Sequence, residues 1–295
     1  MGRFFSDPVE QALDYIYYDL CSGKADKGML LLEEAAAYGD GDACCILARC
    51  LSGRHYVWAG HKFPKDDYRA HRFLEKSLEQ DSPLGILMVL HSRQLSSETP
   101  LSCLQEAFHA VLKKAGDGEP LCQYMIGNVY LGQDFLRTTG KTKDSFASEA
   151  EFNRYMSENI CKCENWFWKS FRGGMFFAGN NLYHYYRKGC APYVLPAPEK
   201  AKDLWRIGAE IGYPIHQYIL ATILEKSRQL TEALRWYKAA AYSGEPNAWA
   251  QVGRFYEKGI GVRQDIHYAI NCYEAGWKRG DIDSGNRLDA LLRRG

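Results

Sequence analysis

Long apolar runs and an excess of charge of either sign are both missing from this sequence. No stretch approaches the roughly 18–20 apolar residues that a helix needs to cross a bilayer. The 37 Lys and Arg residues are offset by 36 Asp and Glu residues, which leaves a formal net charge of +1. A chain this close to neutral has no long-range field that would attract nucleic acid or an anionic membrane. We therefore expect neither a membrane span nor a nucleic-acid partner.

A secretory signal is also missing, because Met1 to Asp7 lacks the basic-then-apolar pattern of such signals. The ten cysteines are irregularly spaced, whereas a disulfide-stapled repeat would carry a pair in every repeat. Most of them lie where a helix would bury a small residue, which is typical of reduced cysteines used as small hydrophobic side chains. Together these features predict a cytoplasmic protein without a ladder of disulfides.

Signatures of catalysis are missing as well. There is no HExxH motif, and Gly259-Ile260-Gly261 lacks the third glycine of a phosphate-binding loop and follows a helix. His55, His61 and His71 are spaced irregularly around a loop, which favours exposed histidines over a metal site. No cysteine is paired with a nearby histidine in a recognised signature. The sequence therefore predicts no catalytic residue, no metal and no cofactor.

What the sequence does contain is an internal repeat, clearest from Ala248 to Gly280. The first half of this repeat places small and apolar residues on one face of a helix, and a glycine-rich stretch then ends that helix. The second half carries another helical face and stops at Gly280, in a C-cap position. The repeated positions are Ala248, Val252, Gly253, Tyr256, Gly259, Gly261, Val262, Asp265, Ala269, Cys272, Tyr273, Ala275, Gly276 and Gly280.

This repeat resembles the Sel-one-like repeat (SLR) family, whose members are related to the tetratricopeptide repeats. The family pattern, A-x3-LG-x2-Y-x2-G-x-GV followed by D-x2-x-A-x2-WY-x2-A-A-x2-G, is matched nearly throughout, including the GxGV turn. Partial matches run from Gly174 to Gly212 and from Gly212 to Gly244, and weaker ones follow Gly39 and Gly118. The resemblance covers the whole chain, strongly after about Gly174 and weakly before it.

The pattern predicts an all-α protein, a right-handed α-solenoid of about seven degenerate helix pairs. We expect a single solenoid over residues 1–295, closed by a capping helix at 283–294. Two of the repeats are stretched, by segments 54–67 and 133–160, and both segments fall between the two helices of a repeat. We expect these segments to be inserted rim loops, where a solenoid tolerates extra residues.

The resemblance also implies where a partner would bind, because in related repeat proteins the first helix of each repeat lines a concave face. Groove positions carried over to the second repeat are Asp42, Cys45, Arg49 and Ser52. The residues selected as the partner-binding site are Tyr124 and Asn128 in the fourth repeat, Asn180, His184 and Arg187 in the fifth, Tyr218 in the sixth and Arg254 in the seventh. We expect these side chains to form one contiguous ladder of aromatic, amide and basic groups.

The resemblance and the missing catalytic signatures predict a protein-binding scaffold or adaptor that holds a peptide or protein in this groove. The arginines favour a partner that is acidic or that offers a free C-terminal carboxylate. One alternative is a bacterial effector, which would be delivered into a host cytosol, or a toxin-neutralising partner using the same groove. Another is an enzyme of the cysteine-rich, β-lactam-hydrolysing type found in the family, although this chain lacks the regular cysteine pairs of those proteins.

Overall fold

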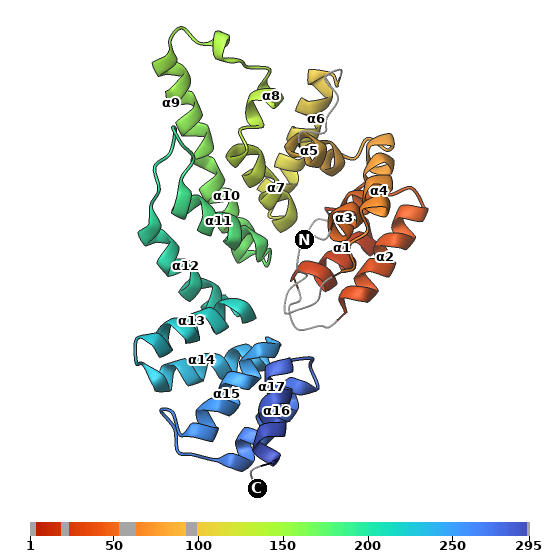
Figure 1. Cartoon of the computed structure of the whole chain (residues 1–295). Coiled ribbons are helices and arrows are strands. Elements are labelled where there is room, and N and C mark those ends of the chain that lie inside the picture. The colour runs from red at the N-terminus through yellow and green to blue at the C-terminus, as the bar shows by residue number, and fades with distance from the viewer. Residues whose placement is uncertain (1–3, 19–23, 53–62, 93–98, 294–295) are drawn as a thin grey trace. The chain divides into compact units, whose positions relative to one another are not determined.

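The computed structural model describes residues 4–18, 24–52, 63–92 and 99–293. The chain divides into two compact units, Met1–Ala201 and Lys202–Gly295, and each is treated by itself. All regular elements within the described residues are helices, apart from one isolated bridge between Cys190 and Val194 (Figure 1). The prediction of an all-α protein is thus confirmed.

The helices follow one another in pairs, as the repeat predicts. The pairs are α1 (Asp7–Leu13) with its π-helical extension η1 (Asp14–Tyr18) and α2 (Ala25–Ala37), α3 (Gly41–Leu51) and α4 (Asp67–Glu79), α5 (Pro83–His91) and α6 (Leu101–Gly116), α7 (Pro120–Leu131) and α10 (Lys162–Arg172), α11 (Phe177–Lys188) and α12 (Pro198–Ile211), α13 (Pro214–Lys226) and α14 (Leu230–Tyr242), and α15 (Pro246–Lys258) and α16 (Ile266–Trp277). A closing helix, α17 (Ile282–Leu292), comes last.

The same short turn joins one pair to the next because a residue there takes a positive φ. Glycine fills the position at 39, 118, 174, 212, 244 and 280, and Asp81, with φ 51°, fills it between α4 and α5. Only glycine adopts this conformation without a steric cost. At several junctions an N-cap residue follows the turn directly. For example, the Asp281 carboxylate accepts a hydrogen bond from the Ser284 backbone nitrogen at 3.2 Å at the start of α17.

Close packing within the pairs depends on small residues in one helix lying under rings of its neighbour. A side-chain carbon on Gly127 of α7 would come within 2.5 Å of the Phe167 ring of α10. In the last repeat, Gly253 of α15 lies against the Tyr273 ring of α16 in the same way. The Leu-Gly position of the sequence pattern is therefore a site where the backbone touches an aromatic ring.

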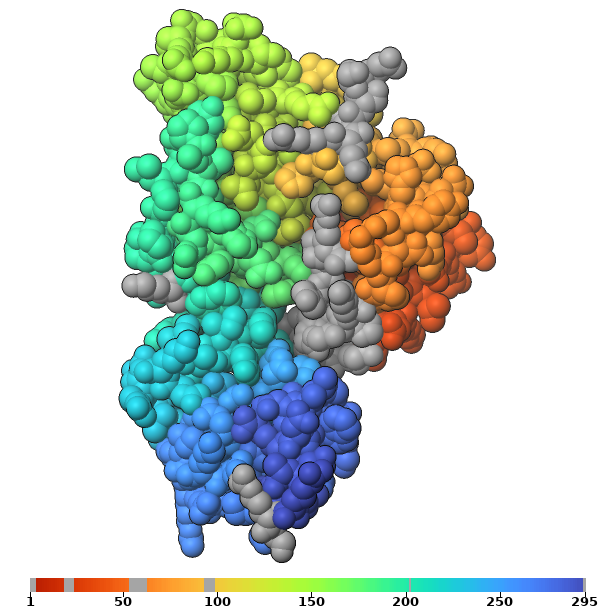
Figure 2. Space-filling view, in the orientation of Figure 1, coloured from red at the N-terminus to blue at the C-terminus, as the bar shows by residue number. Residues whose placement is uncertain are grey.

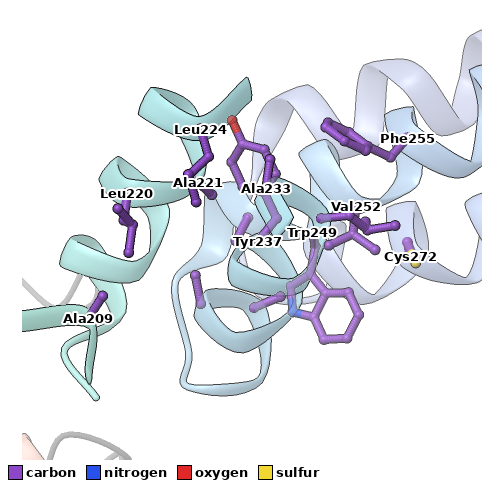
Figure 3. Packing of buried hydrophobic residues seen from close by; sticks show 14 residues of the cluster. Ala209, Leu220, Ala221, Leu224, Ala233, Tyr237, Trp249, Val252, Phe255 and Cys272 are labelled. Carbon is purple, nitrogen blue, oxygen red and sulfur yellow. The ribbon is translucent and has the colours of Figure 1, made fainter. Parts of the chain in front are cut away.

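The second compact unit has a continuous core of buried apolar side chains (Figure 3). Helices α13 to α17 each pack against the next along the chain. Tyr237 of α14 reaches between α13 and α15, where its ring lies 5.6 Å from that of Phe255. Val252 and Cys272, also labelled in the figure, are buried between α15 and α16.

The stretched fourth repeat contains helices of its own. Residues 133–160, expected to form a rim loop, hold α8 (Phe135–Thr139), a 3₁₀ turn η2 (Lys143–Ser145) and α9 (Glu149–Ile160). They form the upper edge of the first compact unit (Figures 1 and 2). The other stretched segment, 54–67, lies largely outside the described residues, and its described end is the N-cap Asp66 of α4.

The closing helix differs in detail from the capping helix predicted at 283–294. Helix α17 packs against α16 and α15. Its contact with α16 is made by Ser284 and Gly285, the latter lying against the Trp277 ring. Leu292 near the end of this helix is 59% exposed, whereas Ser284 near its start is buried against Gly276 of α16.

Candidate functional site: a pocket on the first helices of three repeats

A pocket of about 700 Å³ opens on the first compact unit, where α3, α5 and α7 meet residues from the start of α4. This volume is within the range of pockets that hold small ligands or a few residues of a peptide. The first helices of repeats two, three and four contribute Arg49, Ser52, Met88, His91, Tyr124 and Asn128. The pocket therefore lies on the helices that the repeat pattern assigns to the binding face.

Arg49 of α3 is the most unusual side chain of this pocket. Its guanidinium carbon lies 4.7 Å from the centre of the Tyr124 ring, within the range of a cation–π contact. The Nε and Nη2 atoms are shielded from solvent and have no hydrogen-bond partner among the described residues. Since a guanidinium stays charged in proteins, Arg49 places a positive charge there with two N–H donors unused.

The groups beside Arg49 supply no negative charge at neutral pH. Burial raises the pKa of the Tyr17 hydroxyl well above its usual value, and Cys50 raises it further. Burial also raises the pKa of the Cys50 thiol to about 11. The Tyr17 hydroxyl lies 3.6 Å from the Cys50 sulfur and also interacts with the Arg49 guanidinium, but it stays neutral. Arg49 is left with aromatic and neutral neighbours.

Nearby carboxylates have partners of their own among the described residues. Asp67 lies 2.6 Å from the Lys65 ammonium, and both side chains are largely exposed. Asp134 lies 2.9 Å from Nδ1 of His91. Asp42 lies 3.2 Å from Lys114 and accepts a hydrogen bond from Ser82 at 2.6 Å. The charge of Arg49 is thus the one in this pocket that lacks a carboxylate among the described residues.

Asn128 links the pocket to α11, which carries the next part of the predicted site. Its Oδ1 accepts a hydrogen bond from Asn181 Nδ2 at 2.7 Å. On the same helix, Asn180, His184 and Arg187 are all exposed at helical spacing. The Arg187 guanidinium lies 5.7 Å from the Tyr183 ring centre. Five of the predicted residues therefore lie on α7 and α11 of the first compact unit, two of them in the pocket.

The remaining two predicted residues lie in the second compact unit, where Arg254 contacts a carboxylate and Tyr218 contacts a tyrosine that binds the same carboxylate. Nη2 of Arg254 donates to both oxygens of Glu225, at 2.7 and 2.8 Å, and the Arg254 side chain is only 18% exposed. Tyr237 donates to the same carboxylate at 3.0 Å, and its ring contacts that of Tyr218 at 5.5 Å. Arg254 is therefore committed to a contact within its own unit. The ladder expected to join these residues to α11 spans the two units and stays a prediction.

The selected site left out several pocket residues. Arg49 and Ser52 were among the groove positions carried over to the second repeat, so the repeat pattern already pointed to them. His91 and Met88 belong to the third repeat, whose pattern is the weakest, since Asp81 stands there where the other junctions have glycine. His55 and His61 lie outside the described residues, and the described part of the chain holds no cluster of three metal-binding side chains.

No protein-family model matches the chain. Among curated proteins, it is 28% identical over 99 residues to DAP3-binding cell death enhancer 1 of Rattus norvegicus, and 29% identical over 99 residues to the Mus musculus protein of that name. Each match covers 33% of this chain and 19% of the relative, so the chain matches about a fifth of the length of these relatives. No helix within the described residues is long and apolar enough to cross a membrane.

Solved structures give matches over nearly the whole chain. A Sel1 repeat protein from Oxalobacter formigenes is 19% identical with a TM-score of 0.39, over 96% of this chain and 85% of that one. A protective antigen of uropathogenic Escherichia coli with an SLR fold is 20% identical with a TM-score of 0.38, over 97% and 64%. An immunity protein from Pseudomonas aeruginosa is 13% identical with a TM-score of 0.40, over 94% and 82%. Two of these three structures are described as a Sel1 repeat protein or as having an SLR fold, the family that the sequence resembles.

Proposed function

We propose that this protein is a partner-binding scaffold that holds a segment of another protein in the pocket between α3, α5 and α7. The observation that supports this most directly is the pocket itself, because three successive repeats contribute their first helices to it. It combines an aromatic ring, an amide and an unpaired cation, the groups that fix a peptide segment at an interface.

The exposed stripe of Asn180, His184 and Arg187 extends this surface in the proposal, since Asn128 connects the pocket to α11. Tyr218 and Arg254 belong to the proposed site as a second patch, built around Glu225. The proposed partner is a protein or peptide that is acidic or offers a free C-terminal carboxylate. Nine described cysteines are free, which is compatible with work in a reducing, cytoplasmic compartment.

A pull-down from a lysate of the source cell tests this function. We compare the parent with a pocket variant, Ser52→Lys with Asn128→Lys, which fills the pocket with two long side chains. A matched control carries the same changes outside the pocket, Ser102→Lys on α6 and Asn153→Lys on α9, where both side chains are exposed. We expect the pocket variant to retain at least tenfold less of the partners held by the parent and the control. Equal retention by the two variants would place binding on another surface.

A further inference from the structure

From the state of Arg49, we infer that the pocket is a carboxylate-binding site and that Arg49 is its anchor. The inference rests on the proposed function and names the chemistry of the segment that enters the pocket: a carboxylate, from either a chain end or an acidic side chain. Arg49 differs from the arginine chosen in the second compact unit. Arg254 has a carboxylate partner, whereas Arg49 has none within the described residues.

Because the unpaired Arg49 guanidinium is buried, its surroundings indicate which ligand it would bind. A charge removed from water is costly unless it is paired and hydrogen-bonded. The Tyr124 ring and the hydroxyl groups of Tyr124 and Tyr17 offset part of this cost, but Nε and Nη2 have no hydrogen-bond partner among the described residues. A carboxylate has the geometry for these two donors, because it takes two parallel N–H bonds from the planar fork.

The walls of the pocket favour a carboxylate over a cation or a neutral group. The Lys65–Asp67 pair adds no net charge, and Asp134 is held by His91. Asn128 lines the same pocket, and because its Oδ1 accepts from Asn181, its Nδ2 is left to donate. A carboxylate bound by Arg49 would therefore meet a second donor and no unpaired acidic group.

Nuclear magnetic resonance tests the anchor directly in the full-length protein. The Nε–Hε signals of arginine are observed while three small probes are added at constant ionic strength, up to about 50 mM. N-acetyl-glutamate amide carries only a side-chain carboxylate, N-acetyl-glutamine carries only a terminal carboxylate, and N-acetyl-glutamine amide carries none. Arg49→Lys, which keeps the charge, and Arg49→Met identify the Arg49 signal by its loss.

We expect the Arg49 signal to shift in a saturable manner with at least one carboxylate probe, with a dissociation constant on the order of 1–10 mM for so small a ligand. The amide probe should leave it unchanged. A response to the glutamate probe alone assigns an acidic side chain, a response to the free acid alone assigns a chain end, and a response to both assigns the shared group. The exposed Arg154 on α9, which belongs to neither proposed patch, is the internal control, and its signal should show no saturable shift.

The proposal that Arg49 binds a carboxylate is wrong if its signal stays in place with every probe or shifts equally with the amide. The variants give an independent check through the side-chain amide signal of Asn128. This signal should follow the probes in the parent and lose that response in Arg49→Met. The two proposals fail separately. If the pull-down partner depends on the pocket but binds Arg49→Met as tightly as the parent, the carboxylate site is wrong and the scaffold function stands.

Discussion

Two arginines of the selected binding site have different surroundings, and this difference predicts different responses to the same substitution. Arg254 donates to both oxygens of Glu225, whereas Arg187 is exposed beside a tyrosine ring. Arg254→Glu would place a second carboxylate next to Glu225 in a partly buried site. We expect it to lower the free energy of unfolding by about 1–3 kcal/mol. Urea unfolding measures this loss.

Arg187→Glu is the matched control for that experiment, because an exposed charge contributes little to folding. We expect its free energy of unfolding to stay within about 0.5 kcal/mol of the parent. If both variants are equally stable, the Arg254–Glu225 ion pair is not formed in solution. Arg254 would then be available to a partner, as the sequence pattern suggests.

The buried His216 predicts a dependence of stability on pH. Burial lowers its pKa from 6.5 to about 4. The unfolded chain therefore binds more protons than the folded one between these values, and stability falls as the pH falls through this window. At pH 5 the loss relative to pH 7 is about 2 kcal/mol for this residue. Unfolding in urea at pH 7 and pH 5 should show this loss in the parent.

His216→Leu removes the titrating group and serves as the reference. The buried carboxyl group of Glu245, whose pKa is raised by burial, acts in the opposite direction, because its contribution is lost as the pH rises. Since Glu245 is present in both proteins, the difference between parent and variant reports His216. A difference that is the same at both pH values would show that folding does not shift the pKa of His216.

At the scale of helices, the glycine under an aromatic ring predicts a loss of stability when it is enlarged. Gly127→Ala places a carbon within 2.5 Å of Phe167, whose ring is fully buried and has no room to move. Overpacking of this kind costs about 1–3 kcal/mol. Gly116→Ala, on the adjacent helix α6, is the control, because a side chain there meets nothing within 4 Å.

The control should leave stability unchanged or raise it by up to about 1 kcal/mol, the helix preference of alanine over glycine. Thermal unfolding followed by circular dichroism would rank the variants as Gly116→Ala, parent, Gly127→Ala, from most to least stable. A Gly127→Ala protein as stable as the parent would mean that α7 and α10 lie further apart than described.

The insertion in the fourth repeat divides into an exposed turn and a packed aromatic cluster. Lys143 and Glu149 form an exposed ion pair at 3.0 Å, and the 3₁₀ turn buries no side chain. The Phe146 ring lies 5.0 Å from Tyr155 and 5.3 Å from Phe152. Shortening between Thr142 and Ser145 should therefore change stability by less than about 1 kcal/mol.

Replacing Phe146 by alanine is the contrasting variant, because it removes a ring from the cluster beside α9. We expect a loss of about 1–2 kcal/mol, since the ring is only partly buried and full truncation in a core costs more. The helices of this insertion were not predicted. Its many serines, threonines and lysines indicate a loop, and they outnumber the few aromatic residues that pack together. A cluster of this kind depends on which rings meet in space and has no fixed spacing.

The third repeat shows the limit of prediction at this scale. Glycines marked the start or end of most repeats, and the structure places a positive φ at each of those junctions. Between α4 and α5 the same conformation is adopted by Asp81, so the sequence carried no sign of it. The helices there were located only by their apolar faces.

For the whole molecule, the free cysteines predict that every thiol reacts with an alkylating reagent without prior reduction. The nine described cysteines are free, and most are buried. Alkylation of the denatured protein without reductant should modify all ten cysteines of the sequence, as counted by intact mass. The same protein treated with reductant first is the reference. A mass short by regular pairs of labels would indicate disulfides and would reopen the enzymatic alternative.

The architecture was largely predictable from the sequence, whereas the binding site was predictable only in part. Helical periodicity and terminal glycines gave seven pairs and a closing helix, since both depend on local chemistry. The position of an arginine in the repeat does not determine whether a carboxylate lies beside it. Arg254 and Arg49 occupy equivalent groove positions, yet one meets Glu225 and the other meets Tyr124. Their roles depend on residues that are distant in the sequence.

The shared junction turn makes the repeats interchangeable as building blocks. Each junction contains one residue of positive φ just before the helix that follows. A segment cut from one such glycine to the next, for example 212–244, carries one complete helix pair with matching ends. Duplication or loss of such a segment leaves the positive-φ residue at every other junction in place. Lineages of this protein would then differ in length by whole repeats, and designed versions are best lengthened or shortened at these glycines.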